Sequence, residues 1–112
     1  MSLKDNIKTH FKEKLGGDLN KVTVDEWKTD IYYKSAYSFA VESKIISLQQ
    51  QGKTVEALVE SIILKALDPD GKPLFQSSDR NMLMYEADPA VLLRVAGKLN
   101  SATQEYEGVE KN

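Results

Sequence analysis

The 112-residue chain contains no cysteine and only one histidine, one tryptophan and three prolines. Without cysteine it has no disulfide framework, no thiol nucleophile and no thiolate metal site. The single histidine, His10, has only Glu13 and Lys14 near it at helical spacing, and these form no metal-binding motif. The sequence also lacks a Gly-x-Ser-x-Gly elbow and a glycine-rich phosphate loop. We therefore predict no catalytic residue, no metal and no cofactor, and no enzymatic activity.

Neither sign of charge is in large excess, with 15 basic and 17 acidic residues. The net charge is −2 and the isoelectric point about 5.4, so no global positive field would concentrate nucleic acid or an anionic membrane surface. Charged residues interrupt the apolar positions at the N-terminus, where we see neither a signal peptide nor a membrane span. The length fits one globular domain, which we place at residues 1–103. We expect the polar residues 104–112 to form a disordered tail, and we expect a cytoplasmic location.

Helical periodicity dominates the hydrophobic pattern and predicts about five α-helices. The first helix ends at Gly16-Gly17 and carries a narrow apolar stripe, which we consider a candidate for self-association: Leu3, Ile7, Phe11 and Leu15. The widest stripe lies between Thr54, a candidate N-cap, and Ala66, with Glu56 and Glu60 on its opposite side. Leu64 falls outside this stripe, and it is either an exposed contact for a partner or a scattered surface leucine. Asp88-Pro89 marks the start of the last helix.

The period changes to two between about residues 21 and 34, which predicts a small antiparallel β-hairpin. Val22 and Val24 would share one face, and the connection would run from Asp25 to Asp30. Trp27 lies in this connection, where it either pins the turn to the core or stands exposed as a binding anchor. The fold class is therefore α+β and mainly helical.

A stretch rich in turn residues, 67–79, separates the two halves of the helical region. Asp68-Pro69-Asp70-Gly71 has the chemistry of a tight turn, and Lys72-Pro73 favours extended backbone after it. We expect a short strand near residues 72–76, which either joins the hairpin or stands alone, with Leu74 and Phe75 anchored in the core. A serine or Asp79 would then cap the next helix.

Two blocks of sequence together resemble the tail assembly chaperones of long-tailed, siphovirus-type bacteriophages. The first block is Val22, Val24, Glu26-Trp27 and Ile31-Tyr32-Tyr33-Lys34; the second is Asp68 to Phe75, followed by Asp79-Arg80 and by Val91, Leu92, Arg94, Val95 and Ala96. The resemblance covers roughly residues 20–100. The family often has proline where this chain has Asp25, and arginine where it has Lys34.

The resemblance implies a non-catalytic chaperone of the bacterial host cytoplasm that is absent from the mature virion. Such a protein binds the tape measure protein, keeps it soluble and promotes polymerisation of the tail tube protein around it. Self-association into a ring or spiral is implied, as is a longer product made by a programmed frameshift. Candidate partner-binding residues are Trp27, Leu64 and Phe75, and candidate self-association residues are Leu3, Ile7 and Phe11.

Two other classes of function remain open at this point. The Tyr32-Tyr33-Lys34 run and the lysine-rich first helix would fit a small nucleic-acid-binding regulator, although Asp25, Glu26 and Asp30 around the hairpin repel phosphate. An unrelated interaction domain that dimerises through the first helix is the other alternative.

Overall fold

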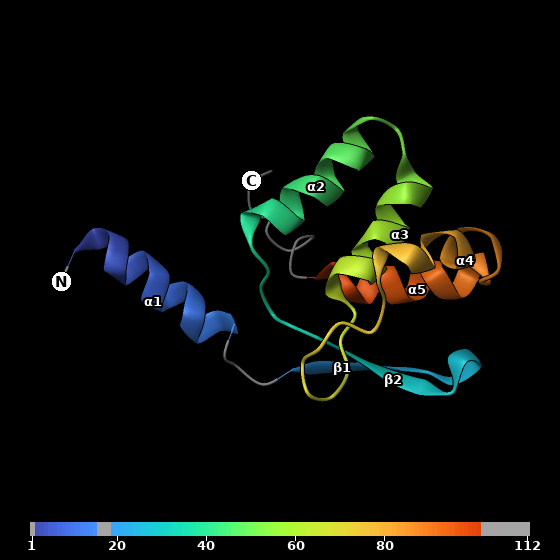
Figure 1. Cartoon of the computed structure of the whole chain (residues 1–112), viewed down its shortest axis with the longest axis horizontal. Helices are drawn as coiled ribbons and strands as arrows, with labels where there is room; N and C mark the ends of the chain where they lie inside the picture. The colour runs from blue at the N-terminus through green and yellow to red at the C-terminus, as the bar shows by residue number, and fades with distance from the viewer. Residues whose placement is uncertain (1, 16–18, 102–112) are drawn as a thin grey trace.

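The computed structural model describes residues 2–15 and 19–101 of the chain (Figure 1). In order, the elements are α1 (Leu3–Leu15), β1 (Asn20–Val24), the 3-10 helix η1 (Asp25–Trp27), β2 (Thr29–Tyr33), α2 (Phe39–Gln50), α3 (Thr54–Lys65), the 3-10 helix η2 (Ser77–Asp79), α4 (Arg80–Tyr85) and α5 (Pro89–Leu99). The predicted class, a mainly helical α+β fold with five α-helices and one hairpin, is confirmed. No described helix is both long and apolar enough to cross a bilayer.

The hairpin pairs β1 with β2 in an antiparallel register that sets Val22 opposite Ile31. Val24 and Ile31 are fully buried, so one face of the ribbon lies on the core as a two-stranded hairpin requires. The connection is shorter than the sequence predicted: Asp30 already belongs to β2, and its carboxylate accepts a 2.8 Å hydrogen bond from the Thr23 hydroxyl. The turn closes through Lys28, whose φ of 54° lies in the left-handed region.

Helix α3 is the centre of the helical part, and α2, α4 and α5 all pack against it (Figure 1). Its predicted apolar stripe faces the core from Val59 onward, whereas Val55, in its first turn, is 57% exposed. The core residues are Val24, Ile31, Val59, Ile62, Ile63, Ala66, Leu83, Val91, Leu92, Val95, Ala96 and Leu99. They come from the hairpin and from α3, α4 and α5, so the hairpin closes one side of the same core that the helices share.

The ends of the helices follow the sequence signals in most cases. The Asp88 carboxylate accepts a 3.0 Å hydrogen bond from the Ala90 amide, with Pro89 at the first helical position. Gly52 has a φ of 78°, in keeping with a position just after a helix. The predicted N-cap role of Thr54 is wrong, because Thr54 is the first residue of α3 and Lys53 precedes it without a side-chain cap.

Leu67 joins the hairpin to the turn-rich stretch. Its amide and carbonyl exchange hydrogen bonds of 2.8 and 2.9 Å with Tyr32, and it forms a second isolated bridge with Pro73. No third strand forms over residues 72–76 in the described chain, so this stretch touches the sheet only through single bridges. The Asp68 carboxylate accepts 2.9 Å hydrogen bonds from the amides of Asp70 and Lys72, which closes the predicted turn.

The prediction that both Leu74 and Phe75 are core anchors is half right. Phe75 packs against the core, whereas Leu74 is 40% exposed. In extended backbone neighbouring side chains point to opposite sides, so one of the two had to face away from the core.

Helix α1 lies apart from the remaining elements and projects from one end of the molecule (Figure 1). Leu3 is 73% exposed and Ile7 is 59% exposed, while Phe11 is half-buried. The Ser2 hydroxyl accepts a 3.2 Å hydrogen bond from the Asp5 amide at the start of the helix. The predicted tail, 104–112, falls outside the described residues.

Candidate partner-binding groove

An apolar groove of about 460 Å³ lies where the hairpin, the stretch after Pro73 and helix α4 meet. Its lining residues are Trp27, Thr29, Ile31, Leu74, Phe75, Met82, Leu83, Glu86 and Ala87. We call this the Trp27–Met82 groove. Two of the three predicted partner-binding residues, Trp27 and Phe75, line it together although 47 positions separate them in sequence.

Local structure explains how each wall is held. The left-handed Lys28 returns the chain from η1 into β2, so Trp27 lies beside Thr29 at the end of the hairpin. The Leu74 amide donates a 3.1 Å hydrogen bond to the Ala66 carbonyl, which fixes the second wall to the end of α3. The Asp79 carboxylate accepts a 2.8 Å hydrogen bond from the Gln76 amide and caps η2, which leads directly into α4, the third wall. The predicted cap by a serine or Asp79 is not made at α4 itself, which begins at Arg80 without a side-chain cap.

The groove has a buried floor and a partly exposed rim. Ile31 and Leu83 are buried and form the floor, whereas Leu74 and Met82, at 40% and 38% exposure, stand at the rim. Trp27 is half-buried: it packs against the core, as the first of the two roles considered for it requires, and it also lines the groove. Such a surface fits the apolar stripe of an amphipathic helix, which typically inserts anchors spaced three or four residues apart.

Charged groups of both signs lie near the groove. Glu86 belongs to its lining, and a shallow neighbouring cleft that shares Thr29 is lined by Asp25 and Asp30 together with Lys28. No group of three or more potential metal ligands occurs among the described residues. What the groove offers is therefore apolar contact, with one acidic side chain, Glu86, in its lining.

The third predicted partner-binding residue, Leu64, lies elsewhere. It lines a separate cleft of about 360 Å³ with Phe11 of α1, and with Tyr37, Val41 and Pro73. Leu64 and Phe11 were predicted for different roles, and the structure brings them together. Leu3 and Ile7 line none of these clefts.

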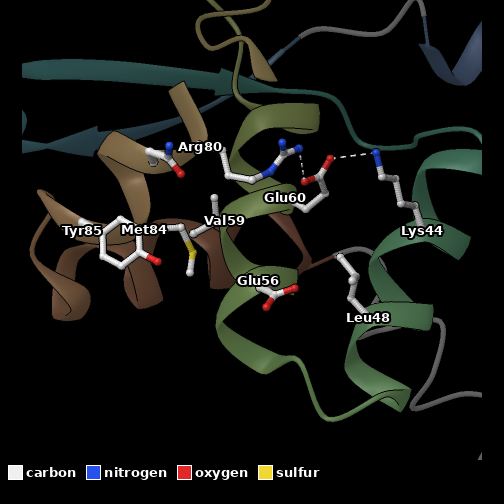
Figure 2. A pocket seen from close by; sticks show the side chains of 9 residues that line it. Lys44, Leu48, Glu56, Val59, Glu60, Arg80, Met84 and Tyr85 are labelled. Atoms are coloured by element: carbon white, nitrogen blue, oxygen red, sulfur yellow. Dashed lines mark hydrogen bonds and ion pairs between the residues drawn. The ribbon is translucent and has the colours of Figure 1, made fainter. Parts of the chain in front are cut away.

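A further concave surface, of about 350 Å³, lies between α2, α3 and α4 and contains a buried carboxylate (Figure 2). The Glu60 side chain is 6% exposed and forms ion pairs of 2.9 Å with Lys44 Nζ and 2.8 Å with Arg80 Nη2. Burial acts to raise the pKa of Glu60, but hydrogen bonds and charge from Arg80 and Lys44 outweigh it and hold that pKa below its ordinary value. The prediction that Glu60 lies on the solvent side of its helix is wrong.

A buried polar cluster ties α2, α3 and α5 together. Lys65 is 1% exposed, pairs with Glu42, and donates a 2.9 Å hydrogen bond to the Asn100 side-chain oxygen. The Asn100 amide nitrogen in turn donates to the Ser61 hydroxyl at 2.9 Å. Burial lowers the pKa of Lys65, against the hydrogen bond and charge of Glu42. Sequence reasoning missed this cluster, because nothing local marks a lysine at the end of α3 as buried.

The architecture thus defines a small α+β protein with an open apolar groove. A scan against known protein families gives no match, and no curated protein matches the sequence. Among solved structures, the fold is similar to that of the bacteriophage HK97 tail assembly chaperone, with a TM-score of 0.57 and 20% sequence identity over 87% of this chain and 95% of the other. At this level of identity the likeness establishes a shared fold.

Proposed function

We propose that this protein is a non-catalytic phage tail assembly chaperone that binds the tape measure protein and keeps it soluble. The fold similarity to a tail assembly chaperone, which covers almost the whole of both chains, supports this role. The observation that carries the proposal is the Trp27–Met82 groove, whose apolar lining and exposed rim fit one face of an amphipathic helix.

A single groove of this size holds only a few apolar side chains, so each contact with the client would be weak. Weak contacts repeated along a long helical client become strong together, because each bound copy raises the effective concentration of the next. The proposal therefore includes self-association of the chaperone, as a ring or spiral, in the host cytoplasm. It also includes help in polymerising the tail tube protein, absence from the mature virion, and a longer frameshifted product.

The direct experiment co-expresses the chain with the tape measure protein of the same phage. The expected result is a soluble tape measure protein that co-purifies with the chaperone. Met82→Asp places a charge at the rim of the groove and should abolish co-purification. Asn81→Asp makes the same change of charge at the neighbouring position, which faces the Glu60 surface, and should leave binding intact.

A tape measure protein that stays insoluble beside the native chain would refute the proposed function. Equal binding by the Met82→Asp and Asn81→Asp variants would refute the assignment to this groove.

A further inference from the structure

The tip of the hairpin is joined to α5 by an ion pair. The Glu26 carboxylate of η1 accepts hydrogen bonds of 2.9 Å and 2.6 Å from the two terminal nitrogens of the Arg94 guanidinium, and the two residues are 68 positions apart in the sequence. Two such bonds fix the direction between the side chains as well as their distance. Neither residue lines the Trp27–Met82 groove, but Glu26 comes directly before Trp27.

The tip of the hairpin, residues 25–30, has few other attachments. Among the described residues, the Glu26–Arg94 pair provides the only hydrogen bonds from this tip to elements outside the hairpin. The tip also contains Lys28 at a φ of 54°, a conformation that is unfavourable for residues other than glycine. A strained turn with few outside contacts opens more readily than the core beneath it, so the pair is placed to hold it closed.

Arg94 is also close to another side of the groove. The hydrogen bond to Glu26 raises the pKa of Arg94, and the charge of Asp88, the N-cap of α5, adds to this rise. Asp88 directly follows Ala87, which lines the groove. One guanidinium therefore lies near both η1, which carries Trp27, and the junction between α4 and α5.

Solvent screens this pair, so we expect its effect to be local. Both side chains are 47% exposed, and exposed ion pairs contribute little to the free energy of unfolding of a whole domain. Val24 and Ile31 stay buried in the core whether or not the pair forms, and they keep the strands in place. What should change is the fraction of molecules in which the tip leaves α5 and carries Trp27 with it.

We propose that Arg94 is a positioning residue for the Trp27–Met82 groove. By holding Glu26 it fixes η1 against α5, and it thereby keeps Trp27 in the wall that the client helix contacts. The inference rests on the proposed function in that last respect, because it concerns how the groove is kept ready for its client. An ion pair outside the groove would then set the affinity of the groove.

The first measurement is the quenching of Trp27 fluorescence by acrylamide in the full-length chain. Trp27 is the only tryptophan, and acrylamide is neutral, so the quenching constant reports exposure of this wall without a direct effect of the substituted charge. Arg94→Gln, Glu26→Gln and the double variant should raise the quenching constant to the same extent, because either single change already removes the pair. Arg94→Lys keeps the charge but not the two parallel hydrogen bonds, and should have an intermediate effect.

The second measurement is the binding of a labelled, tryptophan-free peptide of about 20 residues, long enough to form a helix. Its leucines are spaced three and four positions apart to give one apolar face. Arg94→Gln should raise the dissociation constant by up to about fivefold, the range open to an exposed ion pair. The urea midpoint should stay close to that of the native chain.

Two controls separate the ion pair from general effects of charge. Lys98→Gln removes a positive charge from an exposed position about one turn further along α5, and should match the native chain in quenching and in binding. Raising salt from about 50 mM to about 500 mM should increase quenching in the native chain, because salt screens an exposed pair. The same rise in salt should leave Arg94→Gln unchanged.

Unchanged quenching in Arg94→Gln overturns the inference, as do additive effects of the two single changes or an equal effect of Lys98→Gln. Raised quenching with unchanged peptide affinity also overturns it, since the tip would then open without consequence for the groove. A native chain that binds neither the peptide nor the tape measure protein, but shows the expected quenching pattern, contradicts only the proposed function.

Discussion

Removing both cations from Glu60 should cost far more stability than the sum of removing each one. Lys44 comes from α2 and Arg80 from the start of α4, and their side chains are 57% and 43% exposed, so each ion pair is screened by solvent. Lys44→Met should cost about 0.5 kcal/mol and Arg80→Met about 1 kcal/mol, because Glu60 keeps one partner in either variant.

The double variant is different because the carboxylate itself is 6% exposed. A buried charge that loses its compensation typically destabilises by about 3–5 kcal/mol. The cost of the double variant should therefore exceed the sum of the two single costs by about 1.5–3.5 kcal/mol. Adding Glu60→Gln to the double variant should recover most of this loss, since it removes the buried charge that the other two changes left behind.

Urea denaturation followed by Trp27 fluorescence and far-ultraviolet circular dichroism gives the free energies of unfolding of the native chain and of the variants. The direction in which the free energy of unfolding changes with pH provides an independent test. In the native chain the pKa of Glu60 is lowered, so its contribution to stability is present above the ordinary pKa and is lost as pH falls through the folded pKa. In the double variant burial alone should raise that pKa, so acidification from neutral pH should stabilise the double variant relative to the native chain. Additive costs, within about 0.5 kcal/mol, would refute this account of Glu60.

Four further substitutions test other parts of the structure. The bidentate pair with Arg94 lowers the pKa of Glu26 to about 2, so Arg94→Gln should return that pKa towards 4.5 in an NMR titration, and an unchanged value would contradict the pairing. Tyr37→Phe should cost about 1–3 kcal/mol in thermal or urea unfolding, because its partly buried hydroxyl donates to the Lys65 carbonyl and accepts from the Lys34 amide. Gly71→Ala should destabilise the protein by about 1–2 kcal/mol, because φ at Gly71 is 83°. Gly97→Ala should stabilise it by up to about 1 kcal/mol, because Gly97 lies inside α5 and the new Cβ would meet open space. A change in stability of the same sign for both variants would show that backbone conformation does not control these sites.

Features that depend on neighbours along the chain were predictable from sequence. The Asp88-Pro89 signal placed the start of α5 because the cap and the preset φ act within a few residues. The alternation at Val22 and Val24 gave the hairpin, and the Asp68 and Gly71 chemistry gave the turn. Each of these is decided by local sterics and local hydrogen bonds.

Features decided between distant elements were not predictable. Glu60 shares a helix side with Glu56 and looks like a solvent residue, yet it is buried because Lys44 and Arg80 approach from two other helices. Leu74 and Phe75 were equivalent in the sequence, and their separation into rim and core depends on how the Ala66 carbonyl orients the strand-like segment.

The groove falls between these two cases. Trp27 and Phe75 could be singled out from the sequence as large apolar side chains in connecting segments. The sequence could not predict that they line one groove, or that Met82 of the short helix α4 contributes to it. A helix of only six residues is too short for hydrophobic periodicity to predict which of its side chains face the groove.

The physical character of the groove limits how selective it can be, and this bears on the kind of partner that it suits. An apolar pocket distinguishes ligands that differ by one methylene group by only about 1–3 kcal/mol, and the lining of this groove offers few polar groups to reject a wrong side chain. One groove on one copy therefore cannot recognise a single sequence. Recognition can come instead from multivalency, when many copies held in fixed register bind many apolar stripes on one long client.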